Sequence, residues 1–183
     1  MAPDVGGEKF WASPQAEPKR AYRWLLHFGD GLSVPQWIVT KVSQPGFEIS
    51  EHEHKYLNHS FFYPGRVTWN EVSLTLVDPL NPDATSIMRE MLFESGYLLP
   101  TDPNVQDTIS KARATSRVNK FSLKLLGPKG DPEGSTGNIV GEWNLHNPWI
   151  KKVDFGELSY DSDELVNLTL SVRYDWAVYR SYT

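Results

Sequence analysis

The stretch that decides the fold lies near the C-terminus and reads Val166-Asn167-Leu168-Thr169-Leu170-Ser171-Val172-Arg173-Tyr174-Asp175-Trp176-Ala177-Val178. Its side chains alternate in polarity, which is typical of a β-strand with one face on a hydrophobic core and the other in water. The side chains expected on the core face are Val166, Leu168, Leu170, Val172, Tyr174 and Trp176. At about 3.3 Å per residue, an unbroken strand of this length would span about 40 Å, far more than usual. Such a strand predicts a barrel or a sandwich that extends into a larger assembly.

The rest of the chain also reads as mainly β. The partner of the long strand is expected over Val153 to Tyr160, joined to it through the polar turn at 161–164. Shorter alternating runs begin near Tyr22, Trp37, Val67, Phe121 and Ile139. The chain therefore predicts roughly six to eight strands, arranged as a β-barrel or as two packed antiparallel sheets.

One segment has a clear helical pattern. Asp83 can cap its start, an apolar stripe at helical spacing follows, and Gly96 lies where a C-terminal cap belongs. A weaker helical pattern runs from about Asn104 to Ala114. The predicted fold is therefore mainly β with one flanking α-helix. Residues 1–20 are predicted to form an N-terminal arm, and residues 21–183 a single domain with a Gly/Pro-rich loop at 127–137.

The segment from Phe47 to Asn58 has no apolar face on which to rest. In an extended chain the charged residues 51, 53 and 55 take one side, while His52, His54 and Tyr56 take the other. Such a strand is either a loop or is completed by something outside its own domain. We expect an extended hairpin arm from Phe47 to Tyr63 that pairs with a neighbouring subunit. The predicted subunit-interface residues are Phe47, Ile49, Glu51, His52, Glu53, His54, Lys55 and Tyr56.

Two features flank this arm. Tyr63-Pro64-Gly65-Arg66 is expected to form a turn, because Pro and Gly are adjacent there. The strand that begins at Val67 changes phase near Asn70, so that Val72 and its alternate neighbours share the opposite face. A change of phase within one strand predicts a β-bulge.

Composition excludes several classes of protein. The 183 residues include no Cys, which excludes disulfides, iron–sulfur clusters and Cys-ligated zinc. Lys plus Arg number 18 and Asp plus Glu number 23, which gives a net charge of −5. A chain whose resting role is to hold nucleic acid or an anionic membrane usually has the opposite sign. No apolar run approaches the length of a membrane span, and the N-terminus does not resemble a secretory signal. We expect a chain that folds in a reducing cytoplasm and does not insert into a membrane.

The histidines of the arm are the only cluster with the look of a metal site. His52 and His54 point the same way on a strand, with His59 close behind, and paired imidazoles begin many metal sites in β-barrels. The cupin pattern would continue with a Glu where residues 57–59 stand, and with a further His near a Pro-x-Gly turn. His146, the only distant candidate, lacks that turn. No nucleophile elbow, phosphate-binding glycine loop or zinc-protease motif occurs either. We therefore expect no metal, no cofactor and no enzymatic activity.

Several short motifs, taken in order, resemble the tail tube proteins of contractile-tailed bacteriophages. These are Tyr22-Arg23-Trp24-Leu25-Leu26, Val42-Ser43-Gln44-Pro45-Gly46-Phe47, Tyr63-Pro64-Gly65-Arg66, Glu71-Val72-Ser73-Leu74-Thr75-Leu76-Val77-Asp78, Trp149-Ile150-Lys151-Lys152-Val153-Asp154-Phe155-Gly156-Glu157-Leu158-Ser159-Tyr160 and Arg173-Tyr174-Asp175-Trp176. Together they cover most of residues 21–178. Their order and spacing carry the resemblance, rather than any single motif.

The resemblance implies a structural role. Six copies would form a ring, strands from all six would close a wide barrel around a channel, and rings would stack into a tube inside a sheath. The implied partners are further copies of the chain, the tail sheath protein, and the baseplate and tail-terminator proteins. Double-stranded DNA would pass through the channel on ejection. The implied location is the tail tube of a virion that is assembled in the host cytoplasm.

Several alternatives stay open from the sequence. A baseplate tube initiator, a tail terminator and an injection-machine tube are close variants, and the tube protein of type VI secretion systems is similar in fold. The departures from the tube pattern are the long N-terminal arm and the 127–137 loop. From other classes, a cupin-like metal-dependent enzyme would hold a metal, and a ligand-binding barrel would be a monomer with an apolar cavity. A tube protein instead predicts hexamers or filaments that form with rising concentration.

Overall fold

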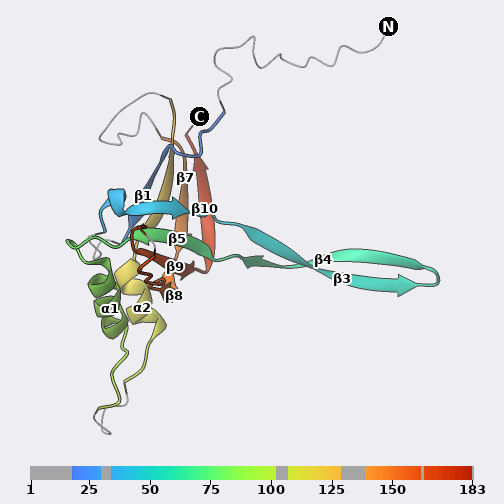
Figure 1. Ribbon diagram of the computed structural model, residues 1–183. Helices are drawn as coiled ribbons and strands as arrows, with labels where there is room; N and C mark the ends of the chain where they lie inside the picture. The colour runs from blue at the N-terminus through green and yellow to red at the C-terminus, as the bar shows by residue number, and fades with distance from the viewer. Residues whose placement is uncertain (1–17, 30–33, 102–106, 129–138, 162, 183) are drawn as a thin grey trace.

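The computed structural model describes residues 18–29, 34–101, 107–128, 139–161 and 163–182 (Figure 1). In chain order the elements are β1 (Trp24–Phe28), the short 3-10 helix η2 (Gln36–Ile38), β2 (Val39–Val42), β3 (Phe47–Tyr56), β4 (His59–Trp69), β5 (Val72–Val77), α1 (Ala84–Glu94), α2 (Lys111–Val118), β6 (Phe121–Leu126), β7 (Ile139–His146), β8 (Trp149–Asp154), β9 (Asn167–Arg173) and β10 (Trp176–Ser181). The predicted N-terminal arm and the 127–137 loop lie almost wholly outside these ranges. The division of the chain at residue 20 therefore stays a prediction.

Eight of the strands form two antiparallel sheets. The first sheet has the strand order β1-β6-β7-β10, and the second has the order β2-β5-β9-β8. The strands of the first sheet run up the view in Figure 1, while those of the second cross below them, with α1 and α2 beneath. The two remaining strands, β3 and β4, pair only with each other and leave the body as a long ribbon. The predicted mainly β fold is confirmed as two packed sheets with a hairpin arm, and the described strands close no barrel.

The core lies between the two sheets and the first helix. β5 and β9 are neighbours in the second sheet, and their inward side chains pair directly, Val72 with Val172 and Leu74 with Leu170. These side chains are fully buried. The first sheet and α1 cover them with Phe121, Leu123, Leu145, Met88 and Met91. The central part of the predicted C-terminal strand therefore does build the core.

That C-terminal stretch is nevertheless two strands rather than one, because the chain bends at Tyr174 and Asp175. β9 belongs to the second sheet and β10 to the first. The pairing keeps a single register through the bend, since Trp149 pairs with Arg173 before it and His146 pairs with Trp176 after it. β7–β8 and β9–β10 thus form one long antiparallel ribbon that passes from one sheet into the other. The prediction of one unbroken strand of about 40 Å was therefore wrong. The two sheets cross, so a chain that passes from one to the other has to bend.

The bend also reverses which side chains face the core. Leu168, Leu170, Val172 and Tyr174 are buried as predicted. After the bend the small Ala177 is buried instead, at 9 % exposure, whereas Trp176 is 46 % exposed. Val166, which precedes β9, is 38 % exposed. Val166 and Trp176 were therefore wrongly predicted to lie in the core. Val166 lies outside β9, and Trp176 lies beyond the bend, where the alternation of residue types continues but the buried side of the strand changes.

The strand that pairs with β9, and the turn expected at 63–66, also differ from the prediction. β8 ends at Asp154, so it overlaps the predicted strand from Val153 to Tyr160 only at its start. Gly156 stops it with a φ of 73°, and its N–H donates to Asp154 Oδ1 at 3.1 Å. The segment 63–66 is not a turn but part of β4, and the arm turns at 57–58. The change of phase near Asn70 marks the boundary between β4 and β5 rather than a bulge within one strand.

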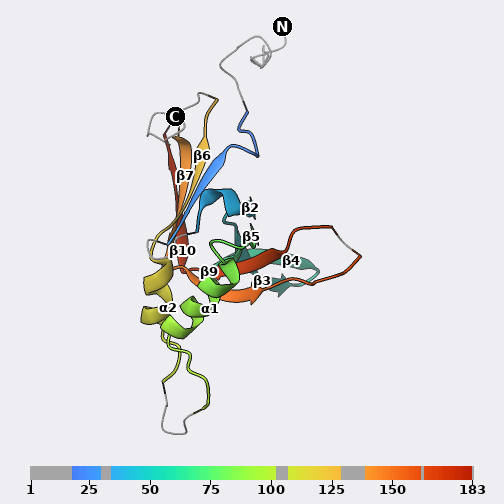
Figure 2. The same cartoon turned by 60° about the vertical axis from the view of Figure 1, so that its left-hand side comes forward.

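The two helices lie together at one end of the second sheet, as Figures 1 and 2 both show. α1 follows the prediction: Asp83 accepts the Ser86 N–H at 2.9 Å as its N-cap, and Gly96 follows the helix with a φ of 106°. α2 starts later than expected, because Ser110 is its N-cap and accepts the Arg113 N–H at 3.3 Å. No helix in the described part of the chain is long and apolar enough to span a membrane.

Candidate assembly surface

The arm formed by β3 and β4 is almost entirely exposed. Every residue of β3, and every residue of β4 except Trp69, is exposed. Eight large apolar side chains lie along the arm with exposures of 49 to 84 %, namely Phe47, Ile49, Tyr56, Leu57, Phe61, Phe62, Tyr63 and Val67. An isolated two-stranded hairpin is marginally stable in water. No other element in the described part of the chain covers this long apolar ribbon.

A β-bulge sits in the middle of the arm. Ile49 pairs with Val67, but Glu51 pairs with Pro64, so Ser50 opposes two residues, Gly65 and Arg66. The Arg66 N–H donates to Ser50 Oγ at 2.9 Å. A Cβ atom on Gly65 would lie 2.3 Å from that hydroxyl and 2.9 Å from the Ser50 carbonyl oxygen, so only glycine fits. The Pro-Gly pair therefore makes a bulge within a strand.

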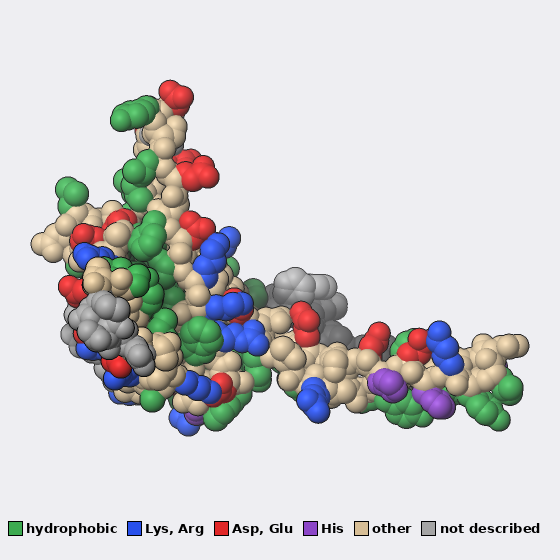
Figure 3. Space-filling model, turned by 90° about the horizontal axis from the view of Figure 1, so that it is seen from below, with side chains coloured by type: hydrophobic (Ala, Val, Ile, Leu, Met, Phe, Trp, Pro, Cys, Tyr) green, Lys and Arg blue, Asp and Glu red, His purple; other side chains and the backbone are tan. Residues whose placement is uncertain are grey.

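Beyond the bulge, the distal half of the arm has two different faces. Directly opposed residues of an antiparallel pair share a face. One face, called here the aromatic face, consists of His52, His54, Tyr56, His59, Phe61 and Tyr63. The other, the charged face, consists of Glu51, Glu53, Lys55, Ser60, Phe62 and Pro64. Figure 3 shows the histidines beside apolar side chains on one side of the distal arm, with carboxylates on the other.

The predicted interface residues all lie on β3, and their role at an interface stays a prediction. On the charged face Glu53 accepts a hydrogen bond from Ser60 Oγ at 2.6 Å and lies 3.7 Å from Lys55 Nζ. Residues 47 and 49 lie on the root side of the bulge. His52, His54 and His59 share the aromatic face, but the described residues contain no group of three side chains placed to hold a metal ion.

Aromatic rings fix the root of the arm to the core. The Phe47 and Trp69 rings meet edge to face at 5.5 Å, and the Trp69 ring lies 6.0 Å from that of Tyr174. Tyr174 is 4 % exposed, and its burial raises its pKa. Because Tyr174 lies at the bend of the long ribbon, the arm leaves the body at the point where the two sheets exchange strands.

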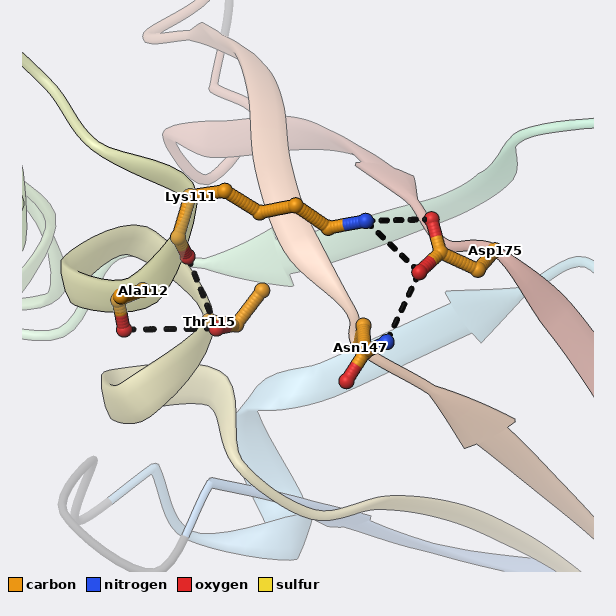
Figure 4. Close-up of polar contacts among 5 residues, drawn as sticks. All are labelled: Lys111, Ala112, Thr115, Asn147 and Asp175. Atoms are coloured by element: carbon orange, nitrogen blue, oxygen red, sulfur yellow. Dashed lines mark hydrogen bonds and ion pairs between the residues drawn. The ribbon is translucent and has the colours of Figure 1, made fainter.

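The carboxylate of Asp175 makes hydrogen bonds that hold the same bend (Figure 4). Asp175 accepts hydrogen bonds from Lys111 Nζ at 2.7 and 2.9 Å, and from Asn147 Nδ2 at 2.7 Å. Asn147 lies at the opposite bend with a φ of 52°, a conformation that Asn tolerates better than most residues. These contacts join both bends of the ribbon to the start of α2. The hydrogen bond from Lys111, followed by that from Asn147, lowers the pKa of Asp175.

We expect Asp175→Asn to destabilise the protein by about 1 kcal/mol at pH 7, because charge-assisted hydrogen bonds are lost at a partly exposed site. A lowered pKa in the folded state gives stability that is present above the unfolded value of about 3.9 and is lost as the pH falls through the folded value. The unfolding curves of the variant and the wild type should therefore converge below about pH 3. Urea titrations at several pH values measure this. A constant difference at all pH values would show that the charge is not responsible.

Asp154→Asn is the matched control for this experiment. The pKa of Asp154 is also lowered, by the Gly156 N–H and then by Lys152, but this carboxylate does not touch the bend. Removing the Asp154 carboxylate should change how the free energy of unfolding depends on pH, but it should not loosen the junction between the two sheets. Only Asp175→Asn should then increase proteolysis at the bends.

Sequence reasoning missed two parts of this surface. The aromatic residues of β4 were not assigned to the arm's interface, because Pro64-Gly65 was interpreted as a turn that ends it. Asp175 was interpreted as an outward residue of a straight strand. The alternation from His59 to Tyr63 is a sequence signal that could have identified β4. The contacts of Asp175 involve residues distant in sequence, so no local pattern signals them.

No protein-family model matches the chain, and no curated protein matches it in sequence. Solved structures do match it. A chain of the cryo-EM structure of the anti-feeding prophage tube terminating cap superposes with a TM-score of 0.62 at 15 % identity, over 90 % of this chain and 92 % of that one. A chain of the extended sheath–tube complex of the extracellular contractile injection system PVC gives 0.60 at 13 % identity, over 90 % and 92 %.

A third match is a chain of the anti-feeding prophage baseplate, with a TM-score of 0.57 at 16 % identity, over 90 % of this chain and 97 % of that one. All three come from contractile injection systems. The chain therefore has a contractile-tail tube-like fold, as its resemblance to tail tube proteins predicted.

Proposed function

We propose that this chain is a structural, non-catalytic subunit of a contractile tail tube whose stacked, hexameric rings enclose a channel. The observation that carries the proposal is the arm, with its exposed aromatic side chains on a ribbon that no other described element covers. Exposed edges and apolar patches of this kind mark surfaces that become buried in an assembly. The tube-like fold supports the same role, because its matches are parts of injection machines.

The outward face of the second sheet is suited to line the channel. Ser73 pairs with Ser171 and Thr75 with Thr169, which places a neutral hydroxyl row on the side away from the core. The flanking strands add Lys41, Lys152 and Asp154 at the edges of this row. The central hydroxyls release no counterions to DNA phosphates, so the middle of this face does not hold a passing duplex. We assign the hydroxyl row to the lumen of a tube that conducts DNA in a bacteriophage virion.

A second candidate function has support of its own. The matched structures include a tube terminating cap, a sheath/tube terminator and a baseplate. A terminator or initiator would form one ring that meets other tail proteins on one side, rather than a stack. In either role the partners would be the sheath, the baseplate and the remaining tube proteins.

Negative-stain electron microscopy of concentrated protein separates these functions. A repeating tube subunit should form tubes whose length grows with concentration, whereas a terminator or initiator should stop at single rings. Sedimentation velocity over a hundredfold range of concentration gives the corresponding masses. A monomer at every concentration would contradict both assembly roles.

A further inference from the structure

An apolar groove runs between the helices and the edge of the second sheet. Its volume is about 610 Å³, and its apolar lining includes Met88, Met91, Leu92, Ile109, Trp149 and Phe155. Leu92, Ile109 and Phe155 are 43, 48 and 46 % exposed. β8, which forms one wall, is the edge strand of its sheet, and among the described strands it pairs with β9 alone. The groove thus combines an exposed apolar floor with an open strand edge.

We propose that this groove receives the aromatic face of the arm of a second copy of the chain. The inference rests on the proposed function, to which it adds the receiving surface. The arm cannot reach the groove of its own subunit, because it points away from the body while the helices lie on the other side (Figure 1). An arm that extends from one side and a groove on another form a head-to-tail contact, which generates rings or filaments rather than a closed dimer.

The chemistry of the two surfaces matches. The aromatic face offers Tyr56, Phe61 and Tyr63, which are 49 to 63 % exposed. The groove offers the exposed apolar side chains of Leu92, Ile109 and Phe155. Burial of aromatic side chains in such a pocket is the usual source of binding energy at an interface.

The charges have opposite signs. The groove is lined by Arg89, Lys151 and Lys152 and by no Asp or Glu among the described residues. Lys151 and Lys152 are neutralised by ion pairs with Glu71 and Asp154, so the net positive charge of the lining comes from Arg89. The distal arm carries Glu51 and Glu53 against the single Lys55, so it is net negative. These three residues lie on the charged face, so their charge steers the encounter over a distance, while the aromatic face makes the contact.

Adjacent phenylalanines provide the first test. Phe61 and Phe62 are 49 and 61 % exposed and lie on opposite faces of the arm. Phe61→Ser should weaken self-association about thirtyfold, the loss expected for one buried aromatic anchor, while Phe62→Ser should weaken it less than threefold. In the groove, Leu92→Glu should abolish association. Leu80→Glu, the same change at a fully exposed leucine outside the groove, should have no effect.

Mixing the defective variants tests the contact itself. Phe61→Ser keeps an intact groove, and Leu92→Glu keeps an intact arm, so at a concentration at which only the wild type assembles, each variant alone should be monomeric. Their mixture should form one-to-one dimers that grow no further, measured by sedimentation velocity. Circular dichroism of each variant confirms folding, since both substituted side chains are exposed in the free chain.

Disulfide crosslinking tests directly whether the arm lies close to the groove. The chain contains no Cys, so any disulfide must join the introduced cysteines. Phe61→Cys and Leu92→Cys, mixed under mild oxidation, should form a crosslinked dimer, and Phe62→Cys should not replace Phe61→Cys. If the wild type assembles but Leu92→Glu assembles equally well, or if the mixture stays monomeric, the groove is not the receptor and the inference is overturned. A wild type that never assembles would instead refute the proposed function.

Discussion

Replacing residues 50–66 with Asn-Gly should yield a stable monomer that forms neither rings nor tubes. The replacement joins the paired residues Ile49 and Val67 through a two-residue hairpin turn, for which Asn-Gly is well suited. It keeps the root contact between Trp69 and Tyr174, and everything removed is exposed. We expect the melting temperature to change by only a few degrees, since no core contact is lost. Circular dichroism melts and sedimentation velocity measure the two outcomes separately.

Tyr160→Ser is the control for the loss of an exposed aromatic side chain, because Tyr160 is fully exposed and lies far from the arm in sequence. It should assemble as the wild type does. Tubes of normal length from the shortened protein would show that the arm has no part in assembly. Loss of cooperative melting would instead show that the arm supports the fold of the body.

Leu170→Asp should leave the protein unfolded at room temperature. Leu170 is fully buried and pairs with Leu74 on one side and Val153 on the other. A carboxylate there has no partner and costs several kcal/mol, a large part of the roughly 5–15 kcal/mol that stabilises a domain. The milder Leu170→Ala should retain the fold and lose about 3 kcal/mol.

Asn167→Asp introduces the same carboxylate on the same strand at an exposed position, so its free energy of unfolding should change by less than about 0.5 kcal/mol. Urea denaturation of the four proteins gives these values. Equal stability of Leu170→Asp and Asn167→Asp would mean that β9 does not face the core as described.

The sequence predicted those features that depend on local pattern. The alternation at Leu168, Leu170 and Val172 identified a core strand because burial follows period two within a sheet. The Asp83 cap placed the first helix for a similar reason. The hairpin arm was predicted from the lack of an apolar face over residues 51–56.

The features that were missed depend on pairing between distant segments. The bend at Asp175 is held by Lys111 and Asn147, and nothing in the local alternation signals such contacts. The bulge at Gly65 was missed because its reason is the approach of Ser50 from the other strand. The groove joins residues of α1, the segment before α2, and β8, and it exists only after the chain has folded.

The one-residue offset at Gly65 also has a consequence for how such chains can diverge. Removing a single codon at 65 or 66 would leave Ser50 opposite one residue, so that the two strands would pair regularly from Ile49 to the tip. The distal pairs, such as His54 with Phe61, would be kept, but the bend and the extra twist that a bulge introduces would be lost. One in-frame deletion can therefore redirect the distal arm without substituting any of its side chains. The body, which meets the ribbon only at its aromatic root, would remain as it is.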